Sequence, residues 1–333
     1  MLDLYITVDT ELWPFSPGWP VNPLPADVSN FDAEFAVYFD GRTAGGDFGV
    51  PYQLALLARY GLKASYFVEP LFSLVAGPDY LQRMVACIES AGQEAQLHLH
   101  TEWLGEIRHP KLPAERRQHL RQYDLAEQTR IVEVASGLLQ QAGAPAPCAF
   151  RAGNYGANFD SLRALAANGI RFDTSHNYCY LHEACGLETQ NHMLGPQTIA
   201  GVIEFPVGYF SDYAGHFRHL QFCACSLNEL KHVLLQAERR AWSSLVLVMH
   251  PFELIRKREE LSRQGLAQPI HSYVRRFELF CKFLSEQRNR IRTRHFRDLE
   301  PNLQLSASPE QVLSSNPLRT AGRMAEQLLA RVY

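Results

Sequence analysis

The stretch Leu4-Tyr5-Ile6-Thr7-Val8-Asp9-Thr10-Glu11 decides the fold class of this chain. Its first five residues form a short apolar run typical of a buried β-strand, and acidic residues follow directly. Similar runs recur along the chain, and each is followed by a helical pattern that a glycine such as Gly61 ends. Repeated strand–helix units predict parallel strands covered by helices. We count about seven units, which are too many for a small doubly wound sheet and suit an α/β barrel.

The remaining predicted elements follow the same alternation. Further strands are predicted at residues 63–68, 97–100, 148–151, 170–174, 203–206, 245–249 and 291–294. Helices are predicted at residues 52–59, 81–90, 120–141, 159–168, 227–240, 272–287 and 317–332. We expect a barrel over residues 1–300 and a C-terminal helical extension over 301–333. Residues 13–49, with five prolines and several aromatic residues, are predicted to form a loop-like insertion.

Composition narrows the function classes. The 333 residues are 46% hydrophobic and 20% charged with a net charge of −3, which excludes a disordered chain and gives no bulk case for binding nucleic acid. Seven cysteines without a CxxC pair argue against a disulfide framework. We find no signal-peptide pattern and no apolar run long enough for a membrane span, so we expect a cytoplasmic protein. The oligomeric state stays open.

Polar side chains stand at the ends of predicted strands. They are Asp9, Glu11, His98, His100, Glu102, Arg151, Asp173 and His250. In an α/β barrel, chemistry collects at the carboxyl ends of the strands because those loops meet at one mouth. Residues two apart on an extended chain point to the same side, so Asp9 and Glu11 can face one centre, as can the two histidines. Two imidazoles and a carboxylate are a usual ligand set for a catalytic divalent metal. The alternative is two unrelated histidines.

Two further residues suit acid–base chemistry. The guanidinium of Arg151 can pair with Asp9 and hold it ionised, or form a purely structural ion pair. His250 ends a buried strand and is either a general acid or a satisfied core histidine. The serine elbow GxSxG, the phosphate-binding GxxxxGK[ST] loop and the dinucleotide fingerprint GxGxxG are absent from the sequence.

Six segments in chain order resemble the motifs of the polysaccharide deacetylase family, also called the nodulation-protein-B homology or chitooligosaccharide deacetylase family. They are Thr7–Glu11, Leu57–Val68, Ala91–His98, Arg151–Gly156, Gly169–Ser175 and Leu245–His250. The resemblance implies a distorted (β/α)7 barrel. The family's two metal histidines are usually four residues apart, but here Glu102 stands four after His98 and His100 stands two after it. The second-motif ligand is therefore His100 or Glu102, and the identity of the metal stays open.

The resemblance implies a hydrolase that removes an N-acetyl, or sometimes an O-acetyl, group from a sugar, breaking a non-peptide carbon–nitrogen bond. It implies a divalent metal, usually Zn²⁺, with Asp9 as base, Arg151 orienting that base and His250 protonating the leaving amine. The ligands would come from Glu11, His98, His100 and Glu102. We expect substrate contacts from Trp13, Asn154, Tyr155 and Asp173.

The pattern His98-Leu99-His100-Thr101-Glu102-Trp103 looks like a branch associated with lipopolysaccharide or cell-envelope sugar biosynthesis. Two other readings stay open beside the acetyl-sugar hydrolase. One is a metal-independent hydrolase of a cyclic amide or ureide, whose activity would survive chelation. The other is a non-catalytic carbohydrate-binding barrel, which would bind glycan without turnover.

Overall fold

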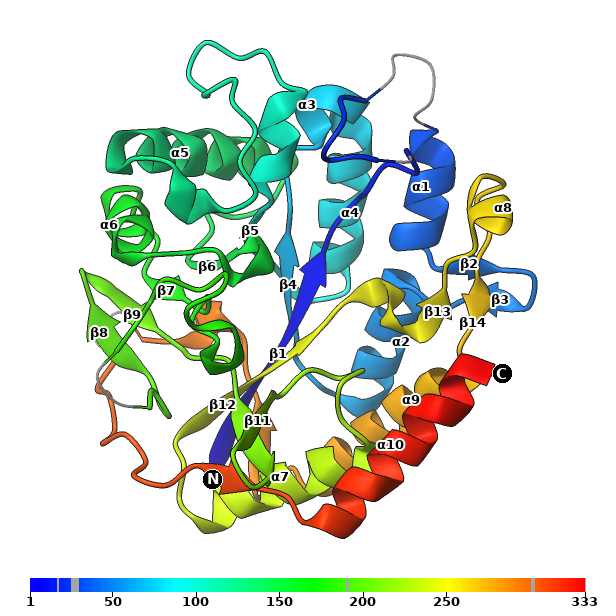
Figure 1. The fold of residues 1–333 in the computed structure, drawn as a ribbon, viewed down its shortest axis with the longest axis vertical. Helices are drawn as coiled ribbons and strands as arrows, with labels where there is room; N and C mark the ends of the chain where they lie inside the picture. Colours follow the sequence, from blue (N-terminus) through cyan, green and yellow to red (C-terminus); the bar gives the residue numbers. More distant parts are fainter. Residues whose placement is uncertain (17, 25–29, 190–191, 301–302, 333) are drawn as a thin grey trace.

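The computed structural model describes residues 1–16, 18–24, 30–189, 192–300 and 303–332. Its centre is a nine-stranded sheet, most of which runs in the order β12-β1-β4-β5-β6-β7-β9-β8 (Figure 1). Seven neighbouring strands in it are parallel: β12 (Ser244–Met249), β1 (Leu2–Thr10), β4 (Ser65–Val68), β5 (Glu94–Leu99), β6 (Ala149–Ala152), β7 (Phe172–Asp173) and β9 (Val202–Glu204). Strand β8 (Gln197–Ile199) is antiparallel to β9, and β15 (Ile291–Thr293) runs parallel to β1.

The sheet curls until its two ends meet. Beyond β9, isolated parallel bridges join Val207 to Val246 and Gln221 to Val248, so the chain after β9 lies beside β12. Only a few hydrogen bonds close this seam, among them Gly208 N–H to the Val246 carbonyl at 3.0 Å. The fold is thus a distorted parallel (β/α)7 barrel, as predicted.

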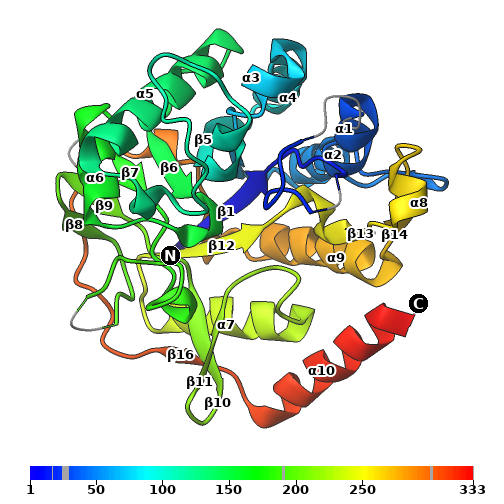
Figure 2. The same cartoon turned by 45° about the horizontal axis from the view of Figure 1, so that its top comes forward.

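Helices surround the barrel (Figure 2). They include α2 (Val50–Tyr60), α4 (Pro78–Ser90), α5 (Leu125–Gln141), α6 (Phe159–Ala167), α7 (Leu227–Arg239) and α9 (His271–Glu286). Gly61 ends α2 in the left-handed conformation, at a φ of 62° that glycine adopts without strain. Ser226 caps α7, because its side chain accepts from Glu229 N–H.

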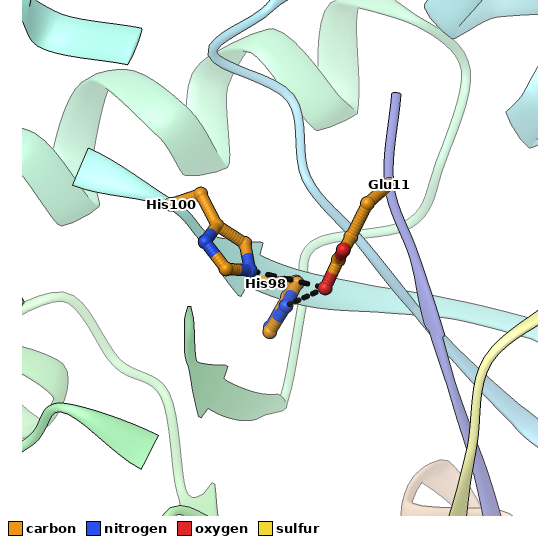
Figure 3. Close-up of side chains that lie close together, drawn as sticks. All are labelled: Glu11, His98 and His100. Atoms are coloured by element: carbon orange, nitrogen blue, oxygen red, sulfur yellow. Dashed lines mark hydrogen bonds and ion pairs between the residues drawn. The ribbon is translucent and has the colours of Figure 1, made fainter. Parts of the chain in front are cut away.

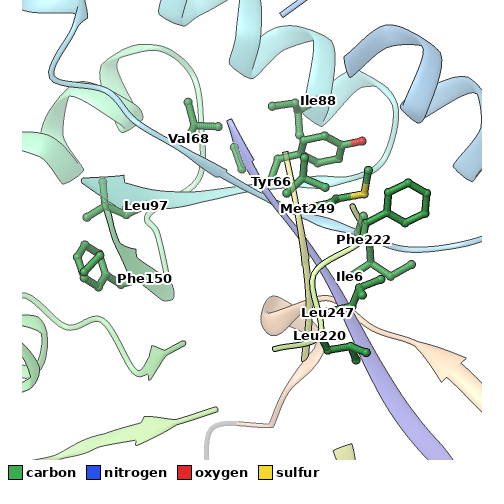
Figure 4. Packing of buried hydrophobic residues seen from close by; sticks show 14 of the residues in the cluster. Ile6, Tyr66, Val68, Ile88, Leu97, Phe150, Leu220, Phe222, Leu247 and Met249 are labelled. Carbon is green, nitrogen blue, oxygen red and sulfur yellow. The ribbon is translucent and has the colours of Figure 1, made fainter. Parts of the chain in front are cut away.

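Strand β1 divides its side chains between two environments. Leu4, Ile6 and Val8 pack outward into the large cluster shared with the helices, part of which Figure 4 shows. Tyr5 points the other way, into a second cluster with Phe67 and Phe296, which fills the barrel interior near the amino ends of the strands. Thr7, Asp9 and Glu11 continue the inner side at two-residue intervals. The barrel interior is therefore apolar near the amino ends of the strands and polar near their carboxyl ends.

The insertion at 13–49 has more regular structure than predicted. It contains α1 (Phe31–Tyr38) and a hairpin of β2 (Arg42–Thr43) and β3 (Gly46–Asp47). Asn30 caps α1 by accepting from Ala33 N–H. The helix escaped prediction because residues 33–38 are all buried, so no polar face marks its period.

The remaining strands and α-helices of the described chain lie outside this barrel core. They are α3 (Ser73–Ala76), β10 (Tyr209–Tyr213), β11 (His216–His219), β13 (Ile255–Arg256), α8 (Glu259–Ser262), β14 (Gln268–Pro269), β16 (Leu313–Ser314) and the 16-residue helix α10 (Pro317–Val332). Strand β16 pairs with β10, and the buried Arg323 of α10 pairs with Asp212 and Glu229. Among the described residues, no helix has the length and apolar character needed to cross a bilayer.

Candidate metal centre

A cavity of about 570 Å³ opens at the carboxyl ends of the strands. Most of the residues singled out from the sequence line it: Asp9, Glu11, Trp13, His98, His100, Asn154, Tyr155 and His250. They come from β1, β5, β6 and β12 and the turns that follow these strands. The parallel register therefore gathers residues up to 241 positions apart (Asp9 to His250) at one mouth.

Three side chains in this cavity converge on one point: Glu11, His98 and His100 (Figure 3). Glu11 Oε1 lies 3.1 Å from His98 Nε2 and 3.0 Å from His100 Nε2. All three residues are buried, and one candidate ligand atom from each lies within 4.8 Å of the others. This is the carboxylate and imidazole set predicted for a divalent metal.

The far nitrogens of both rings have partners of their own. His98 Nδ1 lies 2.8 Å from the carbonyl oxygen of Arg151, and His100 Nδ1 lies 3.3 Å from Glu102 Oε2. Since these oxygens accept, each Nδ1 carries a hydrogen, and a neutral ring then turns the Nε2 lone pair toward Glu11. Such partners fix the tautomer and orientation of metal-binding histidines.

Three electron-pair donors facing one another require a positive charge between them, so the residues fit a divalent cation. Protons are the alternative source of that charge. Burial lowers the pKa of His100, but the carboxylates of Glu11 and Glu102 outweigh burial and hold this pKa well above its usual value. Burial likewise raises the pKa of Glu11, but His100 and His98 outweigh it and hold the pKa well below normal. Zn²⁺ suits the His₂Glu donor set, and ligand chemistry alone does not single it out.

Glu102 is not part of the converging group, which corrects its prediction as a ligand. The extended chain ends at His100, and a 3₁₀ turn over Thr101–Gly105 rotates Glu102 away from the side shared by His98 and His100. Its carboxylate instead lies behind His100 and accepts from Asn154 Nδ2 at 2.9 Å. Of the two candidates left open by the sequence, His100 is the one that belongs to the converging group.

Asp9 and Arg151 form the ion pair expected between them. Arg151 Nη1 donates to Asp9 Oδ1 at 2.7 Å and to Thr7 Oγ1 at 2.8 Å. The rest of this fully buried guanidinium donates to the carbonyl and hydroxyl of Thr174. The guanidinium is thus hydrogen-bonded on every side, and the pair fixes the position of the Asp9 carboxylate, which lines the cavity.

His250 faces the same space from β12. Its Nε2 lies 4.0 Å from both Asp9 Oδ2 and Glu11 Oε1. Its Nδ1 lies 3.0 Å from Glu253 Oε1, which also accepts from Gln221. Burial lowers the pKa of His250, but Glu253 and the carboxylates of Glu11 and Asp9 outweigh burial and raise the pKa to about 9. The ring therefore carries a proton at neutral pH, as a general acid requires.

The turn after β6 is unusually close to the histidines. A Cβ on Gly153 would lie 2.7 Å from His100 Nδ1, so only glycine leaves room for that ring. Asn154 and Tyr155 then take left-handed backbone angles, with φ of 55° and 58°. Non-glycine residues in this region carry strain that gathers at functional sites. Tyr155 packs against Tyr180 at a ring distance of 5.2 Å, and both line the cavity.

Asp173 does not reach the cavity, which corrects its prediction as a substrate contact. Its side chain is fully buried and accepts from Ser175 Oγ at 2.7 Å. It also hydrogen-bonds to Glu204 of the neighbouring strand. Burial raises the pKa of both carboxyls, and Asp173 raises that of Glu204 further, so the pair retains a proton.

Beside this pair, the fully buried His176 predicts an acid-dependent stability. Neither of its ring nitrogens has a hydrogen-bond partner among the described residues, and burial lowers its pKa to about 4. In the unfolded chain the imidazole takes up a proton below about pH 6.5, but in the folded chain only below about pH 4. The free energy of unfolding therefore decreases by about 1.4 kcal/mol for each unit by which the pH drops from about 6.5 to about 4. We expect His176→Leu to remove this contribution. Urea unfolding at pH 7 and pH 5 measures it, and an equal pH dependence in both proteins would contradict it.

Sequence reasoning missed seven cavity residues and one supporting residue. Ala152 lines the cavity at the end of β6. The other six line it without any strand-end position to mark them: Gln118, His119, Tyr180, Glu183, Ala184 and Gln221. Glu253 stands three residues after His250, a spacing that brings side chains together in a helical turn. This three-residue spacing is the sequence feature from which the contact between His250 and Glu253 could have been predicted.

Fold and site together define a parallel β/α barrel with a candidate metal centre at its mouth. No family model and no curated protein sequence matches the chain. Among solved structures it is similar to a family 4 carbohydrate esterase from Streptomyces lividans in complex with acetate, with 12% identity, a TM-score of 0.43 and coverage of 92% of this chain and 98% of that chain.

It is also similar to a putative polysaccharide deacetylase from Mycobacterium smegmatis, with 17% identity, a TM-score of 0.49 and coverage of 91% and 95%. A 4-α-glucanotransferase from Thermococcus litoralis gives 10% identity and a TM-score of 0.48 over 94% of this chain and 40% of that one. At these identities the likeness is one of chain path, and a function for this chain has to be argued from its own site residues.

Proposed function

We propose that this chain is a metal-dependent hydrolase that removes the acetyl group from an N-acetylated sugar. One observation carries the proposal: the converging Glu11, His98 and His100 line one cavity with His250 and with Asp9, the ion-pair partner of the buried Arg151. This arrangement supports the proposal, because amide hydrolysis needs a Lewis acid, a base and an acid around one space.

The chemistry divides among the residues of the cavity. A divalent ion held by Glu11, His98 and His100 supplies Lewis acidity toward the acetyl carbonyl and makes water more acidic. Asp9 accepts a proton from the attacking water, whose oxygen joins the acetyl carbon. His250 donates its proton to the nitrogen as the carbon–nitrogen bond breaks. The products are acetate and the free amino sugar.

The cavity lining indicates an uncharged sugar unit. Tyr155 and Tyr180 offer aromatic surface, while Asn154, Gln118 and Gln221 offer polar groups. Among the described lining residues none is lysine or arginine, the side chains that proteins use to bind phosphate. We further propose a cell-envelope glycan as the source of this unit, on the resemblance of the 98–103 pattern alone.

Acetate release tests the proposal. Purified protein is loaded with Zn²⁺, freed of excess metal and incubated with N-acetylated mono- and oligosaccharides. We expect stoichiometric acetate and free amine, loss of both on chelation, and recovery on adding Zn²⁺. Activity that survives chelation would favour the metal-independent hydrolase. Glycan binding without acetate release would favour the non-catalytic barrel.

A further inference from the structure

Trp13 contacts two of the three converging side chains. Its indole Nε1 donates to Glu11 Oε2 at 2.5 Å. Its ring meets the His100 ring edge-on, with centroids 4.6 Å apart and planes at 79°. An indole N–H is a donor only, so this bond fixes which Glu11 oxygen is occupied.

We propose that Trp13 is a positioning residue of the metal centre, an inference that rests on the proposed function. Glu11 has two oxygens with different surroundings. Oε1 lies against the Nε2 atoms of His98 and His100, while Oε2 is held by Trp13. The indole thereby leaves Glu11 one free oxygen for a cation and locks its rotamer.

This assignment completes a pattern among the converging side chains. The Arg151 carbonyl holds His98, and the Glu102 carboxylate holds His100. Trp13 is the corresponding partner of Glu11, so each candidate ligand has one group behind it that orients it. Outer partners of this kind typically change metal affinity by about 10–100-fold when removed.

The surroundings of Trp13 hold it in place without substrate. Trp19 packs on it at a ring distance of 5.4 Å, and Trp103 packs on Trp19 at 4.9 Å. Trp19 Nε1 donates to Glu106 Oε1 at 3.2 Å, and the same carboxylate pairs with Arg116. The segment carrying Trp13 is thus fastened to the loop after β5. Trp13 also lines the cavity, and its contact with substrate stays a prediction.

Zinc affinity tests the assignment through Trp13→Phe, with Trp19→Phe as the matched control. Both changes remove an indole N–H from the same segment, but only that of Trp13 bonds to Glu11. Competition with a chromophoric chelator measures the dissociation constant of Zn²⁺. We expect Trp13→Phe to bind Zn²⁺ about 10–100-fold more weakly and Trp19→Phe to match the wild type. Equal affinities in the two variants would overturn the assignment.

Two further readouts separate positioning from a loss of folding. Trp13 is only partly buried at the cavity mouth. The unfolding temperature of metal-free Trp13→Phe should therefore stay close to that of metal-free Trp19→Phe. In the cobalt-loaded protein, the visible absorption should change in Trp13→Phe alone, because Glu11 gains a second free oxygen. An unchanged spectrum in both variants would count against the assignment. A wild type that binds Zn²⁺ but releases no acetate would refute the proposed function and leave this comparison intact.

Discussion

Replacing Asp9 with Asn is expected to lower the rate of acetate release by about 10²- to 10⁴-fold, the usual contribution of a general base. The substituted amide keeps an oxygen that can accept from Arg151, which now lies 2.7 Å from Asp9 Oδ1. It cannot take a proton from water. Zinc content should remain, because Asp9 is not among the converging ligands. The measurement is kcat at saturating substrate, together with metal content per chain.

The matched control for this experiment is Asp3→Asn. Asp3 lies on the same strand and also pairs with arginine, with Arg292 Nε 2.8 Å from its Oδ1, but it does not line the cavity. We expect it to keep wild-type activity. Thermal unfolding of both variants checks that the buried Arg151 has not destabilised the barrel. If Asp9→Asn turns over within about tenfold of the wild type, Asp9 is not the base.

Replacing His98 with Gln is expected to lower bound Zn²⁺ from about one per chain to nearly none, and acetate release with it. The change removes one of three clustered donors and the hydrogen bond from Nδ1 to the Arg151 carbonyl. Elemental analysis after zinc loading and removal of excess metal measures the effect.

His119→Gln serves as the control for zinc binding. His119 lines the same cavity but does not belong to the converging group. Zinc retained in this variant and lost in His98→Gln would locate the ion at the proposed centre. Full zinc content in His98→Gln would place the ion elsewhere and remove the main support for the proposed function.

The location of most site residues was predicted from two sequence features: the two-residue alternation of side chains along a strand and the position of polar residues at strand ends. They were enough to bring Asp9, Glu11, His98 and His250 to one mouth, since parallel strands share a direction. They failed where the backbone leaves the extended conformation. Glu102 keeps the spacing of His98 and His100 in sequence, but the 3₁₀ turn that starts at Thr101 breaks the alternation.

Other differences came from partners distant in sequence. Asp173 ends a strand as the pattern requires, but its carboxyl hydrogen-bonds to Glu204 on the adjacent strand and does not line the cavity. Strand β16 has two residues and exists only through pairing with β10, about a hundred positions earlier. No local pattern records such a neighbour, because short strands take their stability from the sheet.

The alternation along β1 also limits how this site can have changed over time. Tyr5, Thr7, Asp9 and Glu11 occupy every second position, and each meets a different depth of the barrel. One residue inserted or deleted within Leu2–Thr10 would exchange the two sides, turning the carboxylates toward the helices or Ile6 toward the barrel interior. We therefore expect the site to tolerate substitutions along this strand more readily than a change in its length.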